Sequence, residues 1–395
     1  MKTTVGRIAA VVLSMLLCAL GLLCVVYSPA WAGWRPVVFA TQYGHLLALL
    51  AAGSAALAMW RWRVRPSGAS RAAALLSVIA FGLLFTPAIR ACRLSGGLAA
   101  GMQAAFGPAT ATASHAPPFS WLTLYRFPPA DVVRTETHEF ARGTDYRLEL
   151  SVVRPPHSLD ANRRLPAIVL VHGGGWDGGN RDELPEFTRW LVSQDFVVFA
   201  IDYRLAPRWK WPAPRDDVGA ALRWVRDQAA QFDVDPGRLL LFGRSAGAQI
   251  ALAAAYDPAS PRVRGVVAFY GPADMTFAYR YGREDDVLKS PALLRAYIGG
   301  TPDERPADYL AASPFEHVRA DVPPTLLVHG ELDTLVWDRQ SERLDARLAE
   351  FGASHYLLLI PGATHALEYN LNSPSGQLAR WAVQRFLARV TAAAP

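Results

Sequence analysis

Three long runs without a charged residue dominate the first quarter of this chain of 395 residues. They cover residues 8–27, 37–60 and 72–89. Each has close to the roughly 20 residues that a helix needs to cross about 30 Å of hydrocarbon. Buried helices of a soluble protein are the alternative, but basic flanks and the lack of acidic residues favour membrane crossing. We therefore expect residues 1–93 to form a membrane anchor of three transmembrane helices.

The distribution of charge supports this interpretation. Residues 1–93 carry nine Lys or Arg and no Asp or Glu, whereas the rest of the chain carries 31 basic and 34 acidic residues. A nucleic-acid-binding domain would need a basic face on its folded part, so no nucleic-acid partner is expected. The bilayer itself is the expected partner of the anchor.

The arginines also predict an orientation. The loop at residues 61–71 holds four arginines and the N-terminus holds Lys2 and Arg7, whereas the loop at residues 28–36 holds one basic residue. Basic segments prefer the cytoplasmic side, so three crossings place everything after the third run outside the cytoplasm. We expect an integral protein of the cell or inner membrane with an extracytoplasmic catalytic domain.

The first run has a second interpretation, as a cleaved signal peptide. Ala30-Trp31-Ala32 resembles a cleavage site, although the apolar region is longer than the usual ~7–15 residues. Either interpretation puts the later chain on the same side. The only cysteines are Cys18, Cys24 and Cys92, so the larger domain has no disulfide framework and no thiolate metal site.

The remaining chain divides into a linker and a large domain. Residues 94–130 are rich in Gly, Ala, Ser, Thr and Pro, which predicts a tether or an arm of a cap. From about residue 131 to 395, short β-branched runs alternate with helical stretches. The predicted strands are 137–140, 146–153, 167–171, 197–201, 239–242, 263–269, 325–328 and 356–360; the predicted helices are 182–194, 216–231, 246–256, 339–351 and 375–390. This alternation predicts an α/β fold with a mostly parallel sheet covered by helices on both faces.

A serine stands at the junction of one predicted strand and one predicted helix. The strand at 239–242 runs into Gly243-Arg244-Ser245-Ala246-Gly247 and then into the helix at 246–256. In a G-x-S-x-G turn of this kind, the strand and helix backbones crowd the positions two before and two after the serine, so glycine fits there. Ser245 is the predicted nucleophile, raised above the edge of the sheet. The alternative is a turn that merely needs glycines.

A glycine-rich loop follows the strand at 167–171, with the sequence His172-Gly173-Gly174-Gly175-Trp176. Such a loop can turn backbone N–H groups toward a developing oxyanion without interference from side chains. We expect the amides of Gly174, Gly175 and Ala246 to be these donors. The loop lacks the Gly-Lys-Ser/Thr of a phosphate loop, so a nucleotide site is not expected.

An acid and a histidine follow the serine, in the chain order expected for a G-x-S-x-G turn between a strand and a helix. Asp333 lies just past the strand at 325–328, and His365 lies in a loop after the strand at 356–360. We predict a triad of Ser245, Asp333 and His365, with Glu331 and Asp338 as alternatives for the acid. No metal and no organic cofactor is required.

These residues resemble the α/β-hydrolase carboxylesterases, of the hormone-sensitive-lipase-like and related bacterial esterase groups. The resemblance covers about residues 135–390. It rests on His172-Gly-Gly-Gly-Trp176, Asp202-Tyr-Arg-Leu-Ala-Pro207, Trp211-Pro-Ala-Pro with Asp217-Val218, Gly243-Arg-Ser-Ala-Gly247, Ser313-Pro314, His329-Gly with Asp333, and His365. It implies ester hydrolysis, a cap over the pocket, and the same triad. Arg244 stands where the lipase-like members usually have Asp, and Ala248 stands where Gly often follows.

The predicted function is a membrane-tethered serine hydrolase that cleaves small-molecule carboxylic esters through an acyl-enzyme. A serine peptidase or amidase of the same fold is the alternative, and a non-catalytic membrane scaffold is a third. Trp176, Trp209 and Trp211 are candidates for an acyl or aryl pocket, although aromatic residues more often serve packing. Arg204 is expected to pair with Asp216 or Asp217. The sequence leaves the oligomeric state open.

Overall fold

The computed structural model of the chain describes residues 2–26, 34–108, 116–126, 133–156 and 164–392. The tripeptide Ala30-Trp31-Ala32, which resembles a cleavage site, lies outside the described residues.

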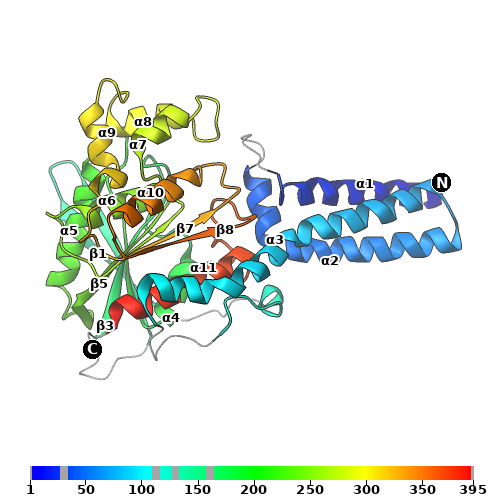
Figure 1. Cartoon of the computed structure of the whole chain (residues 1–395), viewed down its shortest axis with the longest axis horizontal. Helices are drawn as coiled ribbons and strands as arrows, with labels where there is room; N and C mark the ends of the chain where they lie inside the picture. The colour runs from blue at the N-terminus through cyan, green and yellow to red at the C-terminus, as the bar shows by residue number, and fades with distance from the viewer. Residues whose placement is uncertain (1, 27–33, 109–115, 127–132, 157–163, 393–395) are drawn as a thin grey trace.

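Three helices at the N-terminus lie side by side and extend away from the rest of the molecule (Figure 1). They are α1 (Lys2–Leu22), α2 (Trp34–Val64) and α3 (Gly68–Phe106), and each is long and apolar enough to cross a membrane. Small residues let α2 and α3 approach closely, since a Cβ on Gly44 would lie 2.7 Å from the carbonyl oxygen of Leu84. Between α1 and α3, the Ser14 and Ser77 hydroxyls are 2.8 Å apart and hydrogen-bonded.

Helix α3 is longer than the uncharged run that predicted it. It continues to Phe106, so residues 94–106 are helical in the structure, whereas the sequence predicted that the linker begins at residue 94. Leu98, Met102 and Phe106 are buried at a spacing of four residues, and the Phe106 ring lies 5.0 Å from that of Phe386. Leu98, Met102 and Phe106 form an apolar stripe that packs against the C-terminal helix of the large domain. The sequence analysis did not identify this stripe, because the surrounding segment is rich in Gly and Ala.

The large domain contains one eight-stranded sheet with the order β1-β2-β4-β3-β5-β6-β7-β8. The strands are β1 (Arg134–Arg142), β2 (Arg147–Arg154), β3 (Leu165–Val171), β4 (Val197–Ile201), β5 (Val234–Arg244), β6 (Val266–Phe269), β7 (Thr325–Gly330) and β8 (His355–Ile360). Strands β1 and β2 form an antiparallel hairpin, β2 is antiparallel to β4, and all other pairs are parallel. The fold class predicted from the sequence is confirmed.

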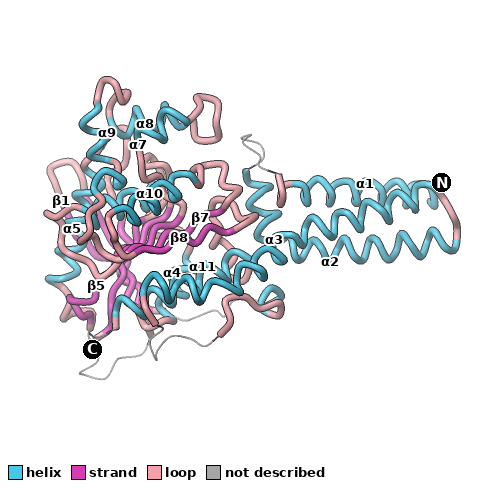
Figure 2. Tube along the Cα trace, in the orientation of Figure 1, coloured by secondary structure: helices cyan, strands magenta, loops and turns pink. Residues whose placement is uncertain are grey.

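Helices cover both faces of this sheet (Figure 2). Successive residues of β3 alternate between two cores. Val169 belongs to the core that includes residues of α5 (Ala213–Asp227), α6 (Ala246–Tyr256) and α10 (Arg339–Glu350). Ile168 belongs to the core that includes residues of α4 (Pro185–Ser193), α11 (Pro374–Thr391) and α3. Because both faces of the strand are buried, its sequence is apolar throughout instead of alternating.

Three short helices lie between β6 and β7. They are α7 (Met275–Tyr281), α8 (Ser290–Ile298) and α9 (Pro306–Ala312), followed by the 3-10 turn η3 (Pro314–His317). They stand together beyond one edge of the sheet (Figure 1). Another 3-10 turn, η2 (Thr123–Tyr125), lies beside the anchor, because the Trp121 ring near it stacks on Phe85 of α3 at 5.5 Å.

Candidate active site

Ser245 occupies a strained turn between β5 and α6. Its backbone has φ 53° and ψ −124°, a conformation that costs energy for a residue with a side chain and that clusters at functional sites. A Cβ on Gly243 would lie 2.2 Å from the carbonyl oxygen of Gly247, and a Cβ on Gly247 would lie 2.2 Å from that of His172. These are the two crowded positions that the sequence motif predicts.

The glycine-rich loop lies directly beside this serine. A Cβ on Gly173 would lie 3.4 Å from the Ser245 Cβ, so the loop passes within van der Waals contact of the nucleophile candidate. Gly174 and Gly175 both have positive φ, of 104° and 62°, which residues with side chains rarely adopt. Their amides and that of Ala246, the first residue of α6, remain the proposed oxyanion donors.

His172 supports the glycine-rich loop through the contacts of its ring. Its Nδ1 lies 2.7 Å from the Gly173 carbonyl oxygen, and its ring stacks on Tyr203 at 4.2 Å. The Tyr203 hydroxyl donates to the carbonyl oxygens of both His172 and Gly173 at 3.2 Å. Burial lowers the pKa of His172, which favours a neutral ring. These contacts give His172 a structural role.

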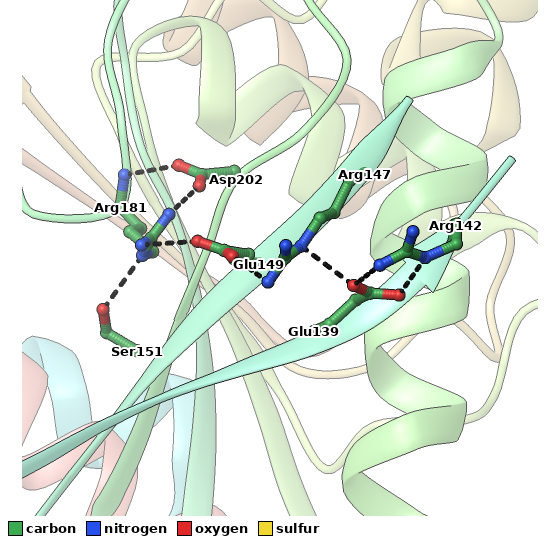
Figure 3. Close-up of polar contacts among 7 residues, drawn as sticks. All are labelled: Glu139, Arg142, Arg147, Glu149, Ser151, Arg181 and Asp202. Atoms are coloured by element: carbon green, nitrogen blue, oxygen red, sulfur yellow. Dashed lines mark hydrogen bonds and ion pairs between the residues drawn. The ribbon is translucent and has the colours of Figure 1, made fainter. Parts of the chain in front are cut away.

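Ion pairs hold the far end of the loop to the sheet (Figure 3). Arg181 donates its backbone N–H and its guanidinium to Asp202 at the end of β4, and it also contacts Glu149 of β2 at 3.0 Å. The chain of contacts continues to β1 through Arg147 and Glu139. The Asp202 of the sequence motif therefore anchors the loop.

The same motif contributes a second ion pair. Arg204 Nε donates to Asp217 at 2.9 Å, one of the two partners that the sequence predicted for this arginine.

Asp333 and His365 are joined as the proposed triad requires. His365 Nδ1 lies 2.7 Å from Asp333 Oδ2, while Asp333 Oδ1 accepts the backbone N–H groups of Leu335 and Val336 at 2.8 and 3.0 Å. Burial opposes ionisation of Asp333, but His365 and His329 outweigh it and hold the pKa of this carboxyl below its ordinary value. Asp333 is therefore an anion at neutral pH and is positioned to fix the orientation of the His365 ring.

One cavity of about 870 Å³ brings these parts together. Ser245, His365 and Gly173 to Gly175 all line it. Within the described part of the chain, no hydrogen bond links the Ser245 hydroxyl to the His365 ring. Catalytic hydrogen bonds are often long without substrate and shorten when it binds.

A buried polar network beside His365 was missed by the sequence analysis. The Tyr270 ring lies 4.1 Å from the His365 ring, and its hydroxyl donates to the buried Glu368 carboxylate. The Arg244 guanidinium lies 3.6 Å from the same carboxylate. Burial, together with the charge of Glu368, raises the pKa of Tyr270 well above its ordinary value, so Tyr270 stays a donor. Arg244, which departs from the family pattern, thus balances an acidic residue on the histidine loop.

The three tryptophans named from the sequence do not line the cavity at Ser245. Trp176 is buried, stacks on Tyr297 at 4.6 Å and donates to Gln249 at 2.9 Å. Trp211 also packs against Tyr297, and Trp209 lies against the Arg204 guanidinium. A direct role in substrate binding stays a prediction for them, while the contacts observed are packing contacts.

Comparison with known proteins adds independent information. Residues 155–348 match the protein family described as BD-FAE. The chain is 30% identical over 251 residues to esterase LipQ of Mycobacterium tuberculosis (strain ATCC 25618 / H37Rv), covering 60% of this chain and 58% of that protein. It is 30% identical over 234 residues to an ethyl acetate hydrolase of Pseudomonas putida, covering 56% of this chain and 71% of that protein.

The chain belongs to the α/β-hydrolase carboxylesterase family. A solved structure of a Pyrobaculum calidifontis esterase has a TM-score of 0.55 and 26% identity to this carboxylesterase-family chain, covering 65% of it and 84% of the esterase. The chain spans less than two thirds of the length of LipQ. The matched family region, residues 155–348, does not extend into the N-terminal helices, which lie before it.

Proposed function

We propose that this chain is a membrane-tethered serine hydrolase that cleaves carboxylic esters. Family membership supports the ester substrate, and the hydrogen bond of 2.7 Å between His365 and Asp333 at the cavity of Ser245 is the observation that carries the assignment. The proposed catalytic residues are Ser245, Asp333 and His365.

In the proposed mechanism, His365 takes the proton of the Ser245 hydroxyl as its oxygen attacks the ester carbonyl carbon. The buried Asp333 carboxylate holds the ring and stabilises the imidazolium that forms. The amides of Gly174, Gly175 and Ala246 donate to the oxyanion, and each such donor is worth ~2.7–4 kcal/mol. The alcohol leaves with the proton from His365, and water then releases the acid from the acyl-enzyme.

The tether in this proposal is the bundle of α1, α2 and α3, whose length and apolarity suit membrane crossing. The basic residues at the far end of the bundle favour a cytoplasmic location for that end. The catalytic domain then lies on the extracytoplasmic side. Protease protection of sealed right-side-out vesicles tests this: exposed sites in the catalytic domain, such as Arg283 in the loop after α7, should be cleaved by added trypsin.

The decisive test of the chemistry uses full-length protein in lipid nanodiscs, with p-nitrophenyl acetate and p-nitroacetanilide as matched ester and amide substrates. We expect turnover of the ester, little turnover of the anilide, and labelling by a fluorophosphonate probe. Ser245→Ala should remove both the turnover and the label. Labelling that persists in the Ser245→Ala protein would refute the nucleophile, and faster cleavage of the anilide would favour an amidase.

A further inference from the structure

The cavity that holds Ser245 is walled on one side by an anchor helix. Trp34, Arg35, Val38, Phe39 and Tyr43 of α2 all line it, together with Ser245 and His365. Their spacing places them on one face of the first three turns of the helix. The segment expected to cross the membrane therefore continues directly into the candidate active site.

These first turns of α2 extend beyond the hydrocarbon. The helix has 31 residues, about 46 Å at 1.5 Å per residue, whereas the hydrocarbon is about 30 Å thick. Arg61 and Arg63 lie at its far end. About 20 residues counted back from Arg61 reach Thr41, so Trp34 to Ala40 stand in the interface on the side of the catalytic domain.

The loop that carries His365 lies at the same end of the helix bundle as the first turns of α2. A Cβ on Gly362 would be 3.2 Å from the guanidinium of Arg90, the first charged residue after the uncharged run of α3, and 3.6 Å from the Cys24 carbonyl oxygen after α1. The carboxyl ends of β7 and β8 point toward this end of the bundle (Figure 1). The catalytic end of the sheet therefore faces the membrane surface.

A second cavity adjoins the first one on the side of the bilayer. Its volume is about 550 Å³, and it shares Tyr43, Leu184 and Tyr369 with the catalytic cavity. It extends to Leu46 of α2 and Tyr125 of η2, whose exposed fractions are 44% and 43%. Leu46 lies inside the stretch that spans the hydrocarbon by the count above. The two cavities thus adjoin each other along α2, between its lipid-facing surface and Ser245.

We propose that the substrate is an amphiphilic ester that resides in the bilayer and reaches Ser245 laterally along α2. The hydrocarbon chain lies against the apolar side chains of Leu46, Phe39 and Val38, and the ester group reaches the serine. This inference rests on the proposed esterase function and adds the substrate class. An ester of a short acid that arrives from water does not need a path along the membrane-facing side of α2.

Paired substitutions on α2 test the route in full-length protein reconstituted in phosphatidylcholine vesicles. Phe39→Ala with Leu46→Ala removes two apolar side chains from the route. Leu49→Ala with Leu50→Ala is the matched control, because these residues lie on the same helix with similar exposed fractions, 55% and 50% against 48% and 44%, and line neither cavity. The substrates are p-nitrophenyl palmitate, which partitions into the vesicles, and p-nitrophenyl acetate, which stays in water.

We expect the route variant to lose at least tenfold more in kcat/KM for the palmitate ester than for the acetate ester. The control should change less than twofold for both. With wild-type protein, tenfold dilution of the palmitate ester by added lipid at constant bulk concentration should lower the subsaturating rate about tenfold.

Lateral access would be overturned if the route variant lost equally on both esters or kept its palmitate rate. It would also be overturned if the wild-type rate followed the bulk concentration of the palmitate ester and not its dilution by lipid. If acetate turnover still depends on Ser245 in those cases, the esterase proposal stands and only the inference fails. A wild-type protein that hydrolyses neither ester and takes no fluorophosphonate label would overturn both.

Discussion

Replacing Asp333 by Asn tests the proposed acid with almost no change in shape. Asp333 Oδ1 accepts two backbone N–H groups, from Leu335 and Val336, so the amide oxygen of an asparagine must occupy that position. The opposite orientation would place its NH2 group against two other donors. The NH2 group then takes the place of Oδ2 and faces His365 Nδ1, which is 2.7 Å away.

An amide donor at that position reverses the tautomer of the histidine. His365 Nδ1 must become an acceptor, so the ring proton moves to Nε2, which can no longer take the proton of Ser245. Loss of the carboxylate also removes the stabilisation of the imidazolium. We expect kcat/KM to fall by about 10³–10⁴-fold, which corresponds to about 4–5.5 kcal/mol of transition-state stabilisation.

The assay is hydrolysis of p-nitrophenyl acetate by full-length protein in nanodiscs, with thermal unfolding as a check on folding. Asp338→Asn is the control, since Asp338 is one of the two alternative acids that the sequence offered and makes no hydrogen bond to His365 among the described residues. It should stay within about threefold of wild type. A loss smaller than tenfold in the Asp333 variant, with the fold intact, would refute the assignment of the acid.

Three other substitutions probe the surroundings of the site. Gly247→Ala should abolish fluorophosphonate labelling and cost at least about 3 kcal/mol of stability by thermal unfolding, because its Cβ would lie 2.2 Å from a backbone carbonyl oxygen. Gly97→Ala is the control and should be nearly neutral, because its Cβ would meet open space. Gln42→Leu should lower the thermal midpoint and kcat by leaving the Asn370 N–H without its 3.1 Å acceptor, a loss of about 1–3 kcal/mol, and unchanged values would contradict this. Burial lowers the pKa of His172, so the contribution of the neutral ring to stability is present above about pH 6.5 and is lost as the pH falls below it. His172→Asn should therefore flatten the decline in thermal midpoint between about pH 7 and 5. If the thermal midpoints of variant and wild type decline in parallel, the argument is wrong.

The parts of the structure that the sequence predicted well depend on local rules. A buried parallel strand such as β3 reads as a continuous apolar run, because both of its faces are covered. The turn at Ser245 could be predicted because its two crowded positions admit only glycine, and the structure places a backbone oxygen 2.2 Å from each hypothetical Cβ. The sequence motif narrowed the partner of Arg204 to Asp216 or Asp217, and the structure pairs it with Asp217.

What the sequence could not predict depends on contacts between distant segments. Gln42 is a buried amide in an apolar run, and it contacts Asn370, Leu367 and Ser375 more than 320 positions away. From the sequence, such a residue looks like a group between two membrane helices. Glu368 gave no signal either, because its partners Arg244 and Tyr270 come from the ends of two other strands.

The contacts of Gln42 bear on how the anchor and the catalytic domain work together. Its side chain donates to Leu367 and Ser375 at 3.2 and 2.9 Å and accepts from Asn370, so one residue of α2 holds the segment that follows His365. Farther along the chain, the stripe of α3 that includes Phe106 covers α11 of the large domain. The anchor helices therefore complete both the histidine loop and one core of the catalytic domain. A hydrolase domain cut away from them would expose an apolar face and leave buried polar groups without partners, so its fold and its proposed active site depend on the same helices that are expected to hold it in the membrane.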